Sequence, residues 1–158
     1  MIIKKRKLCR TTATNAYDLL TDVANVVECK PGNYYQGAWK AEADRVFEEV
    51  PKNACGTTCC VAGFIDELVS KKPIKVNSDF DEKEEIMPIA KKILGLSDLD
   101  AWVLFDEDAV HNQWMKEGGD YDDCPQAGTP EYSALGARHI RRFRDKHKAQ
   151  LKKKKITV

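Results

Sequence analysis

Three of the six cysteines lie within residues 55–64, together with two glycines and two threonines. We expect a helix to begin at Thr57 or Thr58, because threonine is a common helix cap. The unpaired N–H groups and partial positive charge of such a helix start can bind an anion such as a phosphate. Gly56, Thr57 and Thr58 are therefore candidate ligand-binding residues, and a neighbouring cysteine would have a lowered pKa and could act as a nucleophile or redox thiol.

A structural role for the same segment is favoured over these chemical roles. Its small residues, among them Cys59, Cys60 and Ala62, would let the helix approach its neighbours closely, because a buried cysteine thiol behaves as a small hydrophobic group. The sequence has no Gly-x-x-x-x-Gly-Lys loop, so a nucleoside triphosphatase is not supported.

A zinc site would need Cys55, Cys59 and Cys60 to be joined by Cys124 or His111. Structural zinc sites normally use paired knuckles, whereas these cysteines form one cluster, so neither a metal nor another cofactor is expected. A dyad of Cys55 or Cys59 with His111 stays open, because such partners meet only in space. No other catalytic arrangement stands out, so the protein is interpreted as non-enzymatic and no catalytic residue is predicted.

The net charge of +1 conceals an acidic middle and basic ends. Residues 79–123 carry fourteen acidic side chains and four lysines, whereas residues 138–155 carry ten Lys or Arg and one aspartate. Residues 4–10 add five more basic side chains. This pattern is typical of nucleic-acid contact, of ends that fold onto the middle, or of simple solubility.

The basic C-terminal region is a candidate contact surface for nucleic acid or for a protein partner. Arg138, Arg141, Arg142 and Arg144 would lie on one helix and could neutralise phosphates without reading sequence. The alternative is a solvated helix face followed by a frayed lysine tail over residues 152–155.

The acidic residues 106–108, with Asp120, Asp122 and Asp123, could in principle hold calcium. The order of an EF-hand loop is missing, so a solvated acidic surface is favoured. Such a surface could also mimic the charge of a nucleic acid and occupy a basic groove on a partner.

Apolar residues recur mainly at helical spacing and predict a small all-α bundle with long loops and at most a minor β element at residues 75–77. Expected helices cover residues 16–27 after Thr14 as cap, 41–50, 57–69, 81–94, 97–105 after Ser97 as cap, and 130–143 after Thr129 as cap. Residues 34–39 are expected to form a packed loop, and residues 111–128 a polar loop anchored by Trp114 and Tyr121.

Individual residues refine these expectations. Pro88 should lie in the first turn of its helix or kink it, and Gly95 should end that helix. Thr129-Pro130 has the order expected of a helix start, and His139 should pack on the apolar face of that helix.

The chain is predicted to have one helical domain at residues 13–145, between a basic segment at 1–12 and a basic tail at 146–158. No apolar run has the length of a membrane span, and no apolar core follows the charged N-terminus. We therefore expect a cytoplasmic protein without membrane contact, whose cysteines are reduced.

Several motifs occur in an order that resembles a set of small uncharacterised bacterial and bacteriophage proteins. These motifs are Asn33-Tyr34-Tyr35-Gln36-Gly37-Ala38-Trp39, Cys55-Gly56-Thr57-Thr58-Cys59-Cys60-Val61-Ala62-Gly63, Ala90-Lys91-Lys92-Ile93-Leu94-Gly95-Leu96, Leu104-Phe105-Asp106, Thr129-Pro130-Glu131 and Arg138-His139-Ile140. The resemblance covers most of residues 14–143 and implies an all-helical fold and a phage or mobile-element setting, but no activity.

The leading functional hypothesis is a non-enzymatic binding protein, encoded by a phage and acting on a host component, for example as an inhibitor of host defence. One alternative is a binder or sponge of a phosphorylated ligand or nucleotide at Gly56–Thr58, and another is a nucleic-acid-binding accessory protein. A cysteine enzyme is the remaining alternative. The expected partner is a host or phage protein, with nucleic acid as a second possibility.

Overall fold

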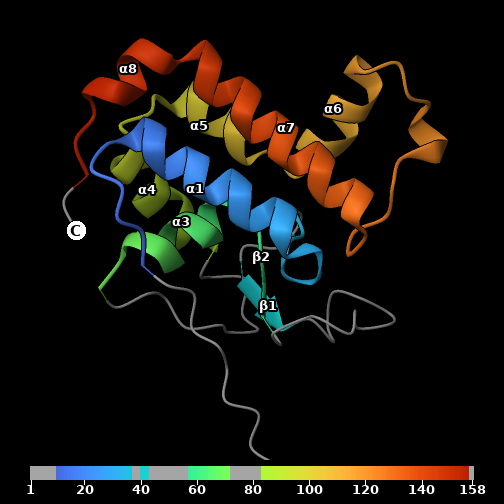
Figure 1. The fold of residues 1–158 in the computed structure, drawn as a ribbon, viewed down its shortest axis with the longest axis horizontal. Helices are drawn as coiled ribbons and strands as arrows, with labels where there is room; N and C mark the ends of the chain where they lie inside the picture. The colour runs from blue at the N-terminus through green and yellow to red at the C-terminus, as the bar shows by residue number, and fades with distance from the viewer. Residues whose placement is uncertain (1–9, 37–39, 43–56, 72–82, 157–158) are drawn as a thin grey trace, which may run out of the picture.

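A computed structural model describes residues 10–36, 40–42, 57–71 and 83–156 of the chain, and it confirms the all-α fold with a minor β element (Figure 1). The described helices are α1 (Ala16–Cys29), α3 (Val61–Val69), α4 (Lys83–Leu94), α5 (Asp98–Phe105), α6 (Ala109–Lys116), α7 (Pro130–Lys146) and α8 (Lys148–Lys153). Two 3-10 turns, η1 (Pro31–Asn33) and η3 (Tyr121–Asp123), lie between them. Strands β1 (Lys40–Glu42) and β2 (Thr57–Cys59) pair antiparallel, with Ala41 opposite Thr58.

Helices α1 and α7 lie side by side and form one face of the bundle (Figure 1). Asn15 caps α1 by accepting a hydrogen bond from the Asp18 N–H, one residue later than the cap predicted at Thr14. Asparagine is as good a cap as threonine, and its side chain reaches the third N–H of the helix. The predicted apolar face is buried, although Val26 is only partly covered.

The start of α7 follows the predicted order. The Thr129 side chain accepts a hydrogen bond from the Tyr132 N–H, and Pro130 occupies the first turn, where its missing N–H costs no hydrogen bond. The buried face of this helix packs against α1, α6 and the turn η1. The buried residues of α7 are Tyr132, Ser133, Leu135, Gly136, Ala137, Ile140 and Phe143.

Gly95 ends α4 as predicted. Its φ of 65° lies in the left-handed region, and its N–H donates to the Lys92 carbonyl while the Leu96 N–H donates to the Lys91 carbonyl. These two bonds form a Schellman motif. Pro88 was predicted either to lie in the first turn of its helix or to kink it. It lies inside α4, so the first of these two predictions is wrong.

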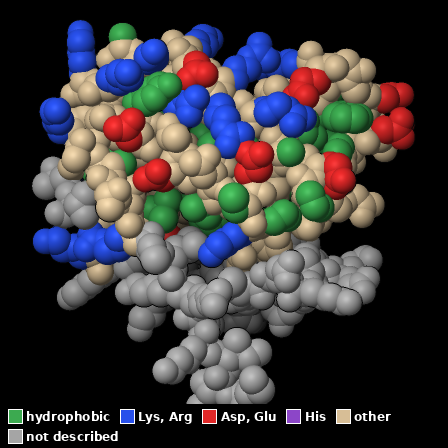
Figure 2. Space-filling model, viewed as in Figure 1, with side chains coloured by type: hydrophobic (Ala, Val, Ile, Leu, Met, Phe, Trp, Pro, Cys, Tyr) green, Lys and Arg blue, Asp and Glu red, His purple; other side chains and the backbone are tan. Residues whose placement is uncertain are grey.

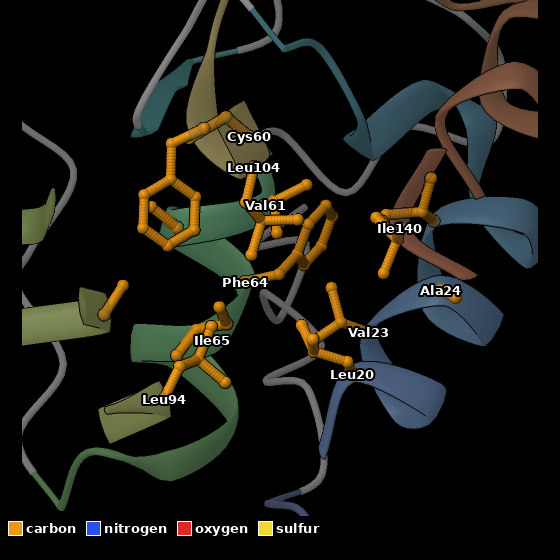
Figure 3. Close-up of a cluster of buried hydrophobic side chains, with 14 of the residues drawn as sticks. Leu20, Val23, Ala24, Cys60, Val61, Phe64, Ile65, Leu94, Leu104 and Ile140 are labelled. Carbon is orange, nitrogen blue, oxygen red and sulfur yellow. The ribbon is translucent and has the colours of Figure 1, made fainter. Parts of the chain in front are cut away.

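The core lies where α3 meets α1, α4, α5 and α7. Figure 3 shows Phe64 of α3 among Val23 of α1, Leu104 of α5 and Ile140 of α7, all of them fully or almost fully buried. These side chains come from segments far apart in the sequence. Their burial therefore fixes the relative positions of the helices.

The predicted helix start at Thr57 or Thr58 is wrong. Residues Thr57–Cys59 form strand β2, and α3 begins only at Val61, with Cys60 in extended conformation at the cap position. The pairing of β2 with β1 uses the backbone of both threonines, so they extend the chain instead of starting a helix. The predicted helix at 41–50 likewise does not start at Ala41, which lies in β1, and its remainder falls outside the described residues.

The polar loop predicted at residues 111–128 is partly wrong, because α6 occupies Ala109–Lys116. Trp114 is half-buried as an anchor, and its indole N–H donates to the Asp120 carbonyl at 2.7 Å. Gly119 lies so close to the indole ring that an added Cβ would come within 2.1 Å of Trp114 Cε2. Tyr121 is 61% exposed and does not anchor the loop by burial.

The frayed lysine tail predicted at residues 152–155 is also wrong. Helix α7 continues to Lys146, and α8 packs against α1 with Leu151 completely buried. The Lys154 carbonyl accepts a hydrogen bond from the Ala16 N–H, and the Ile156 N–H donates to the Thr14 carbonyl. One leucine and two backbone hydrogen bonds thus fix a segment whose composition resembles a disordered tail.

No described helix is both long and apolar enough to span a lipid bilayer. The predicted strand at residues 75–77 and residues 37–39 of the predicted packed loop lie outside the described part of the chain.

Candidate protein-binding surface

Helix α5 exposes an apolar stripe to solvent. Leu99 is 72% exposed, Trp102 64% and Val103 46%. Residues three and four apart lie on the same side of a helix, so these three side chains form one continuous surface. We call it the α5 stripe. Large exposed apolar groups that are adjacent, rather than scattered, mark contact surfaces in folded proteins.

Both ends of the α5 stripe carry acidic side chains. Asp98 and Asp100 lie in the first turn of α5, and Asp106, Glu107 and Asp108 follow its last residue. Between Lys92 and Lys116 the chain has these five acids and no Lys or Arg. The α5 stripe is therefore an apolar surface with acidic residues before and after it in the chain.

Among the described residues, the acids at the N-terminal end of α5 have basic neighbours. Asp98 pairs with Lys91 of α4, and a carboxylate oxygen of Asp100 lies 3.9 Å from His147 Nε2. Within the described part of the chain, no Lys or Arg forms an ion pair with the three acids at the C-terminal end. Most of the negative charge at that end therefore faces solvent uncompensated.

The ends of α5 are held firmly in place. Ser97 caps the helix by accepting a hydrogen bond from the Asp100 N–H, as predicted. At the other end the buried Gln36 amide donates to the Leu104 carbonyl at 3.3 Å and to the Asp106 carbonyl at 3.0 Å. These bonds satisfy carbonyls that the helix end leaves without internal partners. The α5 stripe is consequently presented on a rigid element.

Gln36 belongs to a buried network with two tyrosines. The Tyr34 hydroxyl donates to Gln36 Oε1 at 3.0 Å, and the Tyr132 hydroxyl accepts from the Gln36 N–H at 3.2 Å. Burial raises the pKa of Tyr34 and of Tyr132 well above the ordinary tyrosine value, so both phenols stay neutral. The network supports the end of α5 and supplies no phenolate for catalysis.

His139 also supports α5 from α7. Its Nε2 lies 3.3 Å from the Leu104 carbonyl, which agrees with the packed role predicted for this residue. Burial lowers the pKa of the His139 imidazole, against the opposing effect of the Leu104 carbonyl. His139 is thus neutral near pH 7 and can donate a hydrogen bond to that carbonyl.

The predicted anion-binding residues do not form a helix start. Thr57 and Thr58 lie in β2, and Gly56 lies outside the described residues. The feature that suggested anion binding, a helix N-terminus with unpaired N–H groups at these threonines, is therefore missing from this position. Helix α3 begins beyond them at Cys60 and Val61, both of which are buried.

The described cysteines lie in different environments. Cys60 is buried in the core, Cys124 is half-buried and Cys29 is exposed, and all three carry thiols rather than disulfide sulfurs. Burial raises the pKa of the Cys124 thiol, which makes it a poorer nucleophile at neutral pH. Within the described ranges, no three His, Cys, Asp or Glu side chains are grouped so that they could hold a metal ion.

We expect alkylation of the native protein to follow this burial. In variants that retain one of the described thiols at a time, Cys29 should react readily with iodoacetamide, whereas Cys60 should react only after unfolding. Mass spectrometry of native and urea-unfolded samples measures both rates. Rapid labelling of native Cys60 would contradict its position in the core and would restore the cysteine-enzyme hypothesis.

Three of the four candidate arginines of α7 are engaged within the molecule. Arg138 donates through Nε to Glu117, the C-cap residue of α6, at 3.1 Å from both carboxylate oxygens, and this ion pair lowers the pKa of Glu117. Arg141 pairs with Glu28 and also donates to Asn25, both on α1.

Arg144 donates to Asp145 and to Thr21, and its guanidinium lies 4.9 Å from the centre of the Tyr17 ring. Only Arg142 has no hydrogen bond or ion pair to another described residue. Figure 2 shows basic side chains over this face with acidic side chains among them. The arginines therefore fasten α7 to α1 and α6, and little of their charge is left for a phosphate backbone.

The α5 stripe was not predicted as a contact surface from the sequence. Residues 97–105 were expected only to form a short helix. A signal for it was present, because Leu99, Ala101, Trp102, Val103, Leu104 and Phe105 are all apolar. A short helix this apolar on every side, at the surface of a small bundle, is expected to leave some of its apolar side chains exposed.

Comparison of the chain with protein-family models, with curated proteins and with solved structures found no match.

Proposed function

We propose that this chain is a non-enzymatic binding protein that recognises another protein through the α5 stripe. The observation that carries this proposal is the exposure of Leu99, Trp102 and Val103 on a helix that Ser97 caps at one end and a buried hydrogen bond from Gln36 holds at the other. Exposing a tryptophan and a leucine on a rigid surface contributes nothing to folding. Tryptophan is among the residues that contribute most to protein interfaces.

The proposal includes a phage-encoded protein that acts on a host component, such as a factor of host defence. That setting is supported by the resemblance of the motif order to small phage proteins, and the α5 stripe supports the contact itself. A cytoplasmic location belongs to the same proposal.

The alternative functions have no comparable support. The nucleotide hypothesis depended on a helix start at Thr57 and Thr58, which form a strand. The nucleic-acid hypothesis depended on arginines that are mostly engaged in contacts with α1 and α6.

Site-specific photocrosslinking in living bacteria tests the proposal. A benzophenone amino acid at position 102 should give one discrete covalent adduct, because Trp102 lies at the centre of the α5 stripe. The same probe at Met115, which is 51% exposed on α6, serves as the matched control and should give no such adduct. The absence of an adduct at 102, or the same adducts from both positions, would contradict the proposal.

A further inference from the structure

We infer that the partner of the α5 stripe is a positively charged amphipathic segment, an apolar anchor flanked by Lys or Arg side chains. This inference rests on the proposed function and specifies the chemistry of its partner. It follows from the combination of two features on one helix, an exposed apolar stripe and acidic side chains at both of its ends.

The acidic side chains next to the α5 stripe determine which charge a partner must carry. A side chain that covers Trp102 must come close to Asp106, whose carboxylate is oriented by a hydrogen bond from the Asp108 N–H. Desolvating such a carboxylate is unfavourable unless the partner supplies a cation. A partner rich in Asp or Glu would be repelled, and a neutral one would leave the acids at the C-terminal end of α5, Asp106, Glu107 and Asp108, without a cation.

Geometry argues for an elongated partner rather than a single side chain. The apolar residues Leu99 to Val103 span about 6 Å along the helix at 1.5 Å per residue, and the acids extend the surface beyond both ends. A helix that places apolar residues three and four apart matches this stripe, with its basic residues reaching toward the acidic ends.

A second copy of the chain fits the stripe less well. If two α5 helices packed antiparallel about a two-fold axis, Asp98 and Asp100 of one copy would meet Asp106, Glu107 and Asp108 of the other. Lys91 compensates Asp98, but the arrangement still brings Asp106, Glu107 and Asp108, which have no Lys or Arg partner among the described residues, toward Asp100 of the other copy. The charge distribution therefore favours a basic partner over a dimer formed by α5.

Binding of three synthetic peptides to the full-length protein tests the inference. The first peptide is a helix with a leucine stripe flanked by lysines, the second has glutamate in place of each lysine, and the third keeps the lysines but has serine in place of leucine. We expect the first to bind at least about tenfold more tightly than either of the others, as measured by fluorescence anisotropy. Raising the salt concentration from about 50 mM to about 0.5 M should weaken its binding, because screening shortens the range of the charges.

Matched variants assign the binding to the stripe. Trp102→Ala should weaken binding of the first peptide about tenfold or more, whereas Met115→Ala should leave it unchanged. The double variant Glu107→Gln with Asp108→Asn should weaken binding and flatten its salt dependence. The control double variant Asp122→Asn with Asp123→Asn, in η3, removes the same charge elsewhere and should have no effect.

Each other outcome overturns the inference in a recognisable way. Equal binding of the first two peptides would show apolar docking without charge recognition, which leaves the proposed function intact. Equal binding of the first and third would show general attraction of polycations.

If no peptide binds and sedimentation shows self-association that Trp102→Ala abolishes, the occupant is a second copy. If the first peptide binds only after the basic residues 4–7 are replaced by glutamine, the occupant is the chain's own N-terminal segment.

Absence of peptide binding by a protein that stays monomeric, with and without its basic residues 4–7, would overturn the inference outright. The photocrosslinking result is independent of these peptides. A discrete adduct at position 102 together with peptide failure would retain the α5 stripe as a contact surface and reject only the basic chemistry of its partner.

Discussion

Replacing Leu151 with alanine is expected to lower the free energy of unfolding by about 2–5 kcal/mol. Leu151 is completely buried, although it stands in a segment with four consecutive lysines after it. Its removal would leave a cavity between α8 and α1 and would loosen the docking of the C-terminal segment. Urea denaturation followed by circular dichroism measures the change.

A neighbouring substitution separates packing from the general effect of mutating the tail. Lys153→Ala alters an exposed residue of α8 and should change the free energy of unfolding by less than about 0.5 kcal/mol. If Leu151→Ala were as mild as Lys153→Ala, the C-terminal segment would not be part of the folded core.

The second large effect is expected at Gly136, where Gly136→Val should destabilise the protein by about 3 kcal/mol. A Cβ atom at this position would lie 2.3 Å from Tyr34 Cε1 and 2.7 Å from the Tyr34 hydroxyl oxygen. Tyr34 is completely buried and its hydroxyl is bound to Gln36, so the ring cannot move aside. Valine is a somewhat better helix former than glycine, so the loss would come from the collision and not from helix propensity.

Two comparisons isolate that collision. Arg142→Val, at an exposed position of the same helix, should cost less than about 1 kcal/mol. In a Tyr34→Ala background the additional cost of Gly136→Val should fall sharply, because the colliding ring is gone. An undiminished cost in that background would mean that the ring of Tyr34 does not determine the close approach of η1 and α7.

Local sequence signals predicted the elements whose boundaries depend on neighbouring residues. The caps at Ser97 and Thr129 and the glycine stop at Gly95 are confirmed, because each of them acts through hydrogen bonds within a few residues. The buried faces of α1 and α7 follow from helical spacing alone. These features together were enough to predict the all-α class.

Elements that depend on distant partners were predicted wrongly. Thr57 and Thr58 have the composition of a helix cap, but their backbones pair with β1, which lies about fifteen residues earlier in the chain. The lysine-rich segment after Arg144 is ordered by one buried leucine and by hydrogen bonds to the start of α1. Tertiary contacts decide both cases, and no local pattern records them.

The candidate surface was missed for a related reason. Apolar residues in a helix are normally assigned to the core, and Leu99, Trp102 and Val103 are as apolar as their buried neighbours. Only the packing of α5 against the other helices shows which side of it remains exposed. The sequence instead made cysteines and arginines the candidate site residues. Most of the described ones prove to have structural roles.

If the α5 stripe is the proposed contact surface, its exposure lets binding and stability be tested separately. Trp102 is 64% exposed, so its removal should change the free energy of unfolding by less than about 1 kcal/mol. A residue that contributes little to folding but greatly to binding is what a contact surface requires. A partner identified by the photocrosslinking experiment would make this separation measurable.

The most direct measurement is therefore the dissociation constant of that purified partner for the native protein, for Trp102→Ala and for Met115→Ala, with unfolding measured on the same samples. We predict that Trp102→Ala weakens binding by about 2 kcal/mol, or roughly thirtyfold, while its stability and the affinity of Met115→Ala stay essentially unchanged. Equal dissociation constants for all three proteins would contradict a role for the α5 stripe in recognition.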